Sequence, residues 1–266
     1  PYDAEPRDLA VLAGEYVGPW EAPDADGLSG SRYLQHLAAN GAVPPPAEVA
    51  HLSDLYDAGI RSLDRQIGRL LDGLRERGLL ESSIIVVTSD HGEEFFEHGQ
   101  PLHSQYYGEC VRIPLLVRGP GVLAGRSDAL VSLVDLAPTL LELASVSSPQ
   151  VQGSSLVPLL RAGAGLDRER VFLTGSGDVK GLRTARWSVV PQQGRQQLFD
   201  LQADPDELRD LGGAAEPPPA LHDLARRIEA AHELHSRLRE PLDSAPGVEL
   251  SPEDLRGLRA LGYGGN

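Results

Sequence analysis

An aspartate and a histidine, Asp90 and His91, stand side by side two residues after a short run of β-branched residues at positions 84–87. A carboxylate beside an imidazole offers an oxygen and a nitrogen donor to a divalent cation. The next residue, Gly92, has no Cβ and permits close approach of the backbone. Without a metal, Asp90 would cap a turn and His91 would be solvated. The pair alone leaves both interpretations open.

Two more histidines, His98 and His103, complete a group of three imidazoles within a 13-residue span. Histidine has an ordinary pKa near ~6.5, so it can hold and release a proton around neutral pH. Zinc bound by the three histidines is an alternative, but their spacings of seven and five differ from the helical i, i+4 pair. We interpret the glutamates of this segment as solvated, as most loop carboxylates are: Glu93, Glu94 and Glu97.

The elements that must position these residues are a helix and two strands. Apolar residues recur at three- and four-residue steps over residues 51–77, which predicts an amphipathic helix ended by Gly78. The β-branched run is typical of a buried parallel strand, and residues 113–117 predict a second strand. In an open α/β sheet, ligands bind outside the carboxyl ends of the strands. Asp90 and His91 follow such an end.

The remaining chain divides into regions of different character. Residues 1–50, rich in Pro, Gly and Ala, predict irregular loops, and residues 134–144 predict a helix despite Pro138. A glycine-rich, charged stretch marks a boundary, so we expect an α/β domain over 1–162 and a small α+β domain over 163–266. In the second domain we expect antiparallel strands at 171–173, 182–190 and 197–201, then helices at 221–231 and 252–262.

The amino-acid composition limits the kinds of molecule that this chain is expected to bind. The 266 residues carry a formal net charge of −15, which disfavours nucleic acid and anionic membranes. No apolar run reaches the ~20 residues of a membrane span. Cys110 is the single cysteine, so neither an intrachain disulfide nor a thiolate metal cluster can form. An anionic substrate would need local positive charge, for which a bound cation is the obvious source.

The segment around Asp90 resembles the late active-site segment of the sulfatases, in the alkaline phosphatase superfamily: TSDHGEEFFEHG, followed by RIPLLVRGPG. Other stretches resemble the family in the same order: LYDAGIRSLDRQIGRLLDGL, VSLVDLAPTLLELA, QGSSLVPLL and LFDLQADPDELRDL. The resemblance covers most of residues 51–265. It implies an alkaline-phosphatase-like α/β sheet flanked by helices, here in part, followed by a small antiparallel sheet with a C-terminal helix.

The resemblance also implies roles for individual residues. Asp90 and His91 match the family's second pair of metal ligands, usually to calcium, although another divalent cation would suit them. His103 lies 13 positions beyond Asp90, where similar enzymes place the lysine or histidine that binds the sulfate and protonates the leaving oxygen. His98 matches a histidine of the same loop, and we expect it to bind substrate or to support the site.

The family's nucleophile is a formylglycine made from the cysteine or serine of a CxPxR-like motif. The context of Cys110 does not match that motif, and we expect no catalytic role for it. We therefore interpret the chain as a partial protein, inactive alone, with the nucleophile and the first metal ligands encoded upstream of Pro1. A signal peptide there would indicate a periplasmic or secreted enzyme, and its absence a cytoplasmic one.

The resemblance predicts hydrolysis of a sulfate monoester, with a sulfated small molecule or saccharide as the substrate. In this mechanism the cation neutralises the sulfate and His103 protonates the departing alkoxide. One alternative is a phosphonate monoester or phosphodiester hydrolase of the same superfamily. Another is a non-catalytic binding module that has lost the nucleophile.

Overall fold

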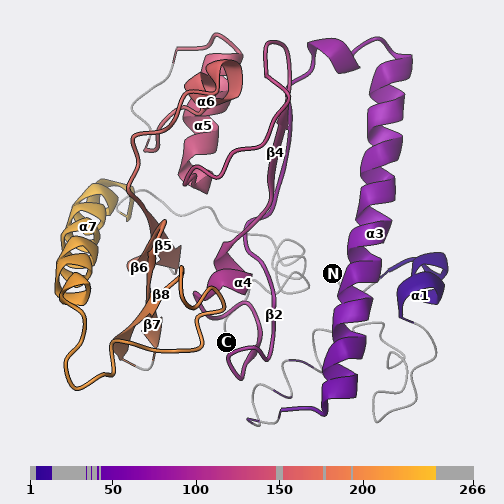
Figure 1. Cartoon of the computed structure of the whole chain (residues 1–266). Coiled ribbons are helices and arrows are strands. Elements are labelled where there is room, and N and C mark those ends of the chain that lie inside the picture. Colours follow the sequence, from indigo (N-terminus) through magenta and orange to yellow (C-terminus); the bar gives the residue numbers. More distant parts are fainter. Residues whose placement is uncertain are drawn as a thin grey trace.

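The computed structural model describes residues 4–13, 34, 37, 41, 43–147, 152–175, 178–192 and 194–243, with side chains to residue 237. In this part of the chain an α/β region precedes a four-stranded antiparallel sheet that is covered by one helix (Figure 1). The fold class is therefore the predicted one. The predicted last helix, residues 252–262, lies outside the described residues.

The long helix α3 spans Pro46–Glu76 and confirms the helix predicted from residue 51. It begins earlier because Pro46 sits at a first-turn position, where proline is favoured and its missing N–H is not needed. Gly78, with φ of +67°, lies just past its end. Helix α1, Pro6–Leu12, packs against α3, so the prediction of irregular structure was wrong there. Seven residues are too few to show a helical period.

Asp8 joins these two helices. Its side chain is almost fully buried, and it accepts hydrogen bonds from Ser62, Arg61 and Arg65 of α3. Hydrogen bonds from Arg65 outweigh the effect of burial and hold the pKa of Asp8 far below its usual range. This pairing fixes α1 along the side of α3.

After the 3₁₀ turn η1, Leu80–Ser82, strand β1 spans Ile85–Thr88 and pairs with β4, Leu115–Arg118. Both strands were predicted, but they are antiparallel, with Ile85 opposite Arg118. The neighbour of β1 among the described residues is therefore antiparallel, whereas the sequence suggested a parallel one. A β-branched run favours a strand but carries no information about the direction of its neighbour. Between the strands lie the short pair β2, Glu94–Phe95, and β3, Pro101–Leu102, and the helical turn α4, Gly108–Val111.

The predicted helix at 134–144 is present as the 3₁₀ turn η2, Leu133–Asp135, continuing into α5, Leu136–Leu143. Pro138 is tolerated because it lies in the first turn of α5, where its missing N–H has no helical acceptor. A further helix, α6, spans Val157–Ala162. The predicted domain boundary falls at its end, where Gly163 adopts the left-handed conformation with φ of 62°. The two-domain division stays a prediction.

The C-terminal sheet confirms the predicted antiparallel arrangement, with strands in the order β5-β6-β7-β8. They span Arg170–Gly175, Asp178–Thr184, Trp187–Gln192 and Arg195–Asp200. The single strand predicted at 182–190 was wrong, because it is divided between β6 and β7. The hydroxyl oxygen of Thr184 accepts the N–H groups of Arg186 and Trp187, which closes a turn between them.

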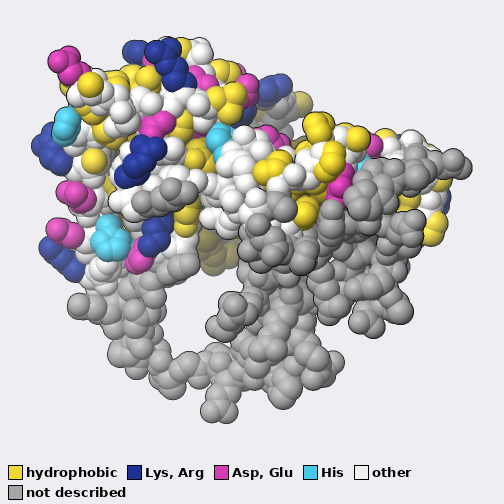
Figure 2. Space-filling view, turned by 90° about the horizontal axis from the view of Figure 1, so that it is seen from below, with side chains coloured by type: hydrophobic (Ala, Val, Ile, Leu, Met, Phe, Trp, Pro, Cys, Tyr) yellow, Lys and Arg dark blue, Asp and Glu magenta, His cyan; other side chains and the backbone are white. Residues whose placement is uncertain are grey.

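Helix α7, Pro219–Asp243, confirms the predicted amphipathic helix and packs on this sheet. Their shared core contains Leu224 and Ile228 from the helix and these sheet residues: Val179, Leu182, Val189 and Leu198. No helix among the described residues is both long and apolar enough to cross a membrane. Figure 2 shows Lys and Arg side chains interspersed with Asp and Glu over the described part of one face.

Candidate active site

The loop that carries Asp90 and His91 leaves the carboxyl end of β1 and is held by α4. The Gly92 N–H donates to the Cys110 carbonyl at 2.7 Å, and the Glu93 N–H donates to the Glu109 carbonyl at 3.1 Å. A Cβ added to Gly92 would lie 1.9 Å from the Glu109 carbonyl oxygen. Glycine is therefore required at this position, and the loop depends on α4 for its course.

Asp90 and His91 form a donor pair at this strand end. Nδ1 of His91 lies 2.7 Å from the Gly92 carbonyl oxygen, so we assign the proton to Nδ1 and the lone pair to Nε2. Nε2 lies 3.7 Å from Oδ1 of Asp90, and the Asp90 side chain is 64% exposed. A metal-binding histidine usually donates its other ring N–H to such a carbonyl. The donor set and its exposure fit two ligands of one divalent cation.

His103 lies against this pair. Its ring stacks on His91 with 3.8 Å between the ring centroids. Nδ1 of His103 lies 3.4 Å from Oε1 of Glu93, whose side chain is only 4% exposed. The structure thus brings Asp90, His91 and His103 together, as their spacing suggested. The interpretation of Glu93 as a solvated carboxylate was wrong, because its side chain turns inward to His103.

His98 points elsewhere. Its Nδ1 lies 2.5 Å from Oε1 of Glu109, and its Nε2 lies 3.1 Å from the carbonyl oxygen of Glu207. Both neighbours accept hydrogen bonds, so only the doubly protonated ring satisfies both contacts. The structure does not bring His98 together with His91 and His103, which removes the geometric basis for zinc bound by three histidines. Substrate binding by His98 stays a prediction that this placement does not support.

Glu94 was also interpreted as solvated, and this was wrong because the residue is fully buried. Its carboxylate accepts the His98 N–H at 2.9 Å and the Gln105 amide at 2.8 Å. Burial raises its pKa above the ordinary value, although these hydrogen bonds act in the opposite direction. Ligand atoms of Glu94, His98 and Glu109 lie within 4.8 Å of one another, but hydrogen bonds inside the protein already engage them.

Cys110 is buried on α4, with 3% of its surface exposed. Burial, together with the negative charges of Glu94 and Glu109, raises the pKa of its thiol to about 12. A thiol that keeps its proton at neutral pH is a poor nucleophile. This supports the expectation that Cys110 has no catalytic role.

The raised pKa of Cys110 predicts a loss of stability at alkaline pH. The thiol ionises from about pH 9 in the unfolded chain but stays protonated in the folded one, so the free energy of unfolding falls as pH rises above 9. Ionisation of the Cys110 thiol alone should lower the free energy of unfolding by about 1 kcal/mol at pH 10. Urea unfolding at pH 7.5 and 10 should show a smaller decrease for Cys110→Ala than for the wild type. Equal decreases would contradict the prediction.

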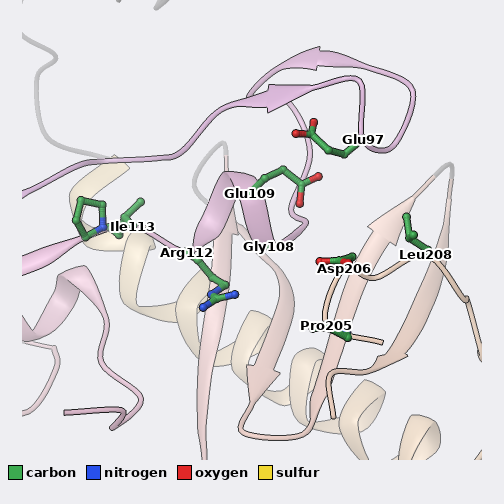
Figure 3. Close-up of a pocket in the computed structure, with 9 residues that line it drawn as sticks. Glu97, Gly108, Glu109, Arg112, Ile113, Pro205, Asp206 and Leu208 are labelled. Carbon is green, nitrogen blue, oxygen red and sulfur yellow. The ribbon is translucent and has the colours of Figure 1, made fainter. Parts of the chain in front are cut away.

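An open pocket of about 820 Å³ lies beside α4 (Figure 3). It contains none of Asp90, His91 and His103. It is lined by residues of the β2–β3 loop, of α4 and its C-terminal continuation, and of the segment after β8: Glu97, Gly108, Glu109, Arg112, Ile113, Pro114, Pro205, Asp206 and Leu208. The cluster of Asp90, His91 and His103 and this pocket are therefore built from different residues.

Comparison with known proteins agrees with this geometry. The family model "Sulfatase" matches residues 19–146, and "N-sulphoglucosamine sulphohydrolase, C-terminal" matches residues 97–234. Mouse (Mus musculus) arylsulfatase K is 30% identical over 201 residues, covering 69% of this chain and 36% of the relative. The choline-sulfatase of Rhizobium meliloti (strain 1021) is 34% identical over 193 residues, covering 66% of this chain and 36% of the relative.

Solved structures show the same likeness. A protein in complex with its substrate D-glucosamine-2-N,6-O-disulfate matches with a TM-score of 0.59 and 28% identity, over 81% of this chain and 48% of that one. The phosphonate monoester hydrolase of Silicibacter pomeroyi matches with a TM-score of 0.60 and 25% identity, over 85% of this chain and 51% of that one. The chain spans little more than a third of the length of the two sulfatase relatives. On these matches and on the geometry at the end of β1, the chain belongs to the sulfatase family of the alkaline phosphatase superfamily.

Proposed function

We propose that the protein carrying this chain is a sulfuric ester hydrolase that cleaves a sulfate monoester. The observation that carries the proposal is the clustering of Asp90, His91 and His103 at the carboxyl end of β1. Relatives named arylsulfatase and choline-sulfatase support the reaction class. The nucleophile is proposed to be a formylglycine outside these 266 residues, since the only cysteine among them is buried and protonated.

Asp90 and His91 are proposed to hold a divalent cation, with calcium as the first candidate. When bound, the cation supplies positive charge that neutralises the sulfate group. The carbonyl of Gly92 orients the His91 ring and keeps the lone pair on Nε2, which is the atom available to the metal. The chain has a formal net charge of −15, and a bound cation would supply the local positive charge that an anionic substrate needs.

His103 is proposed to bind the sulfate and to donate a proton to the leaving oxygen. In its doubly protonated form the ring donates Nδ1–H to Glu93, and Nε2–H remains for the substrate. The inward-facing carboxylate of Glu93 limits rotation of the ring, and the stacked His91 ring covers one of its faces. His103 therefore presents its free edge close to the metal-binding pair.

The substrate is proposed to be a sulfated small molecule or saccharide. One structural relative was solved with its substrate D-glucosamine-2-N,6-O-disulfate, and one sequence relative is named a choline-sulfatase. A second candidate reaction is phosphonate monoester hydrolysis, favoured by the likeness to the Silicibacter pomeroyi enzyme. Rates of the purified complete enzyme on an aryl sulfate and on an aryl phosphonate monoester distinguish the two. A higher kcat/KM for the phosphonate would overturn the sulfatase assignment.

The metal ligands are tested separately from the reaction. Replacing Asp90 or His91 by alanine removes one donor, and we expect calcium binding to weaken by at least tenfold, as even partners of metal ligands cause 10–100-fold losses. Calcium content by elemental analysis and affinity by titration calorimetry measure this. Asp128→Ala serves as the control because its carboxylate is 96% exposed and pairs only loosely, at 3.8 Å, with the equally exposed Arg126. Wild-type metal content in both ligand variants would contradict the assignment.

A further inference from the structure

Glu207 is a buried carboxylate in the C-terminal region that the proposed mechanism leaves without a role. It lies in the segment LFDLQADPDELRDL, after β8, and only 1% of its surface is exposed. Its φ of 55° is in the left-handed region, which costs a non-glycine residue energy. A buried charge on a strained backbone persists only where its surroundings hold it firmly.

Two parts of the molecule hold this carboxylate. Nη1 of Arg183, on β6, lies 3.1 Å from each carboxylate oxygen of Glu207. From the other side, the N–H of Gly108, the first residue of α4, donates to Oε2 at 2.6 Å. A Cβ on Gly108 would lie 3.0 Å from the same oxygen, so glycine permits this close approach. Glu207 thus links the C-terminal sheet to α4 across 99 positions of sequence.

A second contact runs beside the first. The carbonyl oxygen of Glu207 accepts the Nε2–H of His98, while Nδ1 of His98 contacts Glu109 on α4. Figure 3 shows α4 between the loop that carries Glu97 and the segment that carries Pro205, Asp206 and Leu208. The backbone and the side chain of Glu207 therefore both act on the same helical turn.

The helical turn α4 in turn holds the metal-binding loop. Its Glu109 and Cys110 carbonyls are the acceptors for the N–H groups of Glu93 and Gly92, which follow Asp90 and His91 directly. A displacement of α4 would move these acceptors. The Asp90–His91 pair and the carboxylate that orients His103 would then lose their backbone anchors.

We propose that Glu207 is a positioning residue for the active site: through α4 it fixes the loop of Asp90, His91 and Glu93. The contacts themselves stand on the structure alone. Their consequence for metal binding rests on the proposed function. This gives the C-terminal region a direct part in building the site.

The test compares two carboxylate-to-amide changes in the same segment. Glu207→Gln removes the negative charge and replaces one acceptor oxygen by an NH2 donor, which faces the Arg183 guanidinium in either orientation of the amide, so the link between Arg183 and α4 is weakened. Asp210→Asn is the matched control. Asp210 likewise pairs with an arginine, Arg195, and accepts the N–H groups of Leu198 and Gly212, but it does not contact α4.

Two readouts separate positioning from general stability. Amide hydrogen exchange of Gly92 and Glu93 in the folded protein, followed by NMR, should be at least tenfold faster in Glu207→Gln and unchanged in Asp210→Asn. Calcium affinity should fall about 10–100-fold in Glu207→Gln, as for other residues that support metal ligands, and remain within twofold in Asp210→Asn. Circular dichroism confirms that each variant is folded under the assay conditions.

Wild-type exchange at Gly92 and Glu93 in folded Glu207→Gln would overturn the proposal, as would equal changes in the Asp210→Asn control. If Glu207→Gln does not fold, Arg183→Lys, which weakens the same link from the β6 side, is judged by the same criteria. Asp90→Ala reports on the proposed function independently. If it leaves calcium binding intact, the metal assignment fails, while the exchange rates still decide the role of Glu207.

Discussion

Replacement of His103 by alanine in the complete enzyme is expected to slow hydrolysis of an alkyl or sugar sulfate by ~10²–10⁴-fold. The decrease in the rate of hydrolysis should be much smaller with a nitrophenyl sulfate, because nitrophenolate departs readily without protonation. The expectation follows from the position of His103, stacked on His91 and held by Glu93 with one ring edge free. Steady-state kcat on the two classes of ester, for variant and wild type, measures the difference.

A matched control for this experiment is His232→Ala, on the exposed side of α7, which should leave both rates unchanged. An equal loss on both esters for His103→Ala would contradict proton donation and leave His103 with an anion-binding or structural role. A rise in KM with unchanged kcat would point to sulfate binding alone.

The clustering of Asp90, His91 and His103 could be predicted because its signal is local. Asp90 and His91 follow the end of β1 after one residue, Ser89, and His103 lies within the same short segment. Strand ends, adjacent donors and fixed spacings are all visible in a single sequence. The helix α3 and the amphipathic α7 were predictable for the same reason, since their period repeats many times.

The residues that hold the site could not be predicted, because their partners are distant in sequence. Glu207 meets Gly108 across 99 positions, and its carbonyl oxygen meets His98 across 109 positions. In the sequence alone, Glu207 looks like a solvent-exposed acidic residue of a loop. Glu93 and Glu94 were misjudged for that reason, and only the fold reveals that both are buried.

The direction of β1 relative to β4, and the division of residues 182–190 between β6 and β7, could not be predicted for similar reasons. The pairing of β1 with β4 joins residues about thirty positions apart, and neither strand carries a signal for its neighbour's direction. The turn between β6 and β7 has no glycine or proline to mark it. Its signal is the Thr184 hydroxyl, which accepts two backbone N–H groups and replaces the usual turn residues.

Asp135 is expected to contribute strongly to stability, and Asp135→Ala should lower the free energy of unfolding by about 3–5 kcal/mol. Its fully buried carboxylate accepts both ends of the Arg168 guanidinium and the N–H groups of Ser132 and Ser154, the latter two at 2.8 Å. It thereby joins η2 and α5 to the segments on either side of α6. Alanine would leave Arg168 mostly buried without a partner.

Asp135 should also make the free energy of unfolding depend on pH in the acidic range. Burial acts to raise the pKa of Asp135, but the hydrogen bonds from Arg168, Ser154 and Ser132 outweigh it and hold the pKa below its ordinary 3.8. A depressed folded-state pKa means that the stabilisation is complete above about pH 4 and is lost as pH falls through the folded value. Urea unfolding of wild type and Asp135→Ala should therefore differ most at neutral pH, and the difference should shrink as the pH falls below about 4. Asp128→Ala, which removes a 3.8 Å ion pair to Arg126 that is almost fully exposed, should change stability by less than about 1 kcal/mol at either pH. A difference between wild type and Asp135→Ala that stays constant from pH 7 to pH 3 would show that packing, rather than the ionised carboxylate, stabilises this junction.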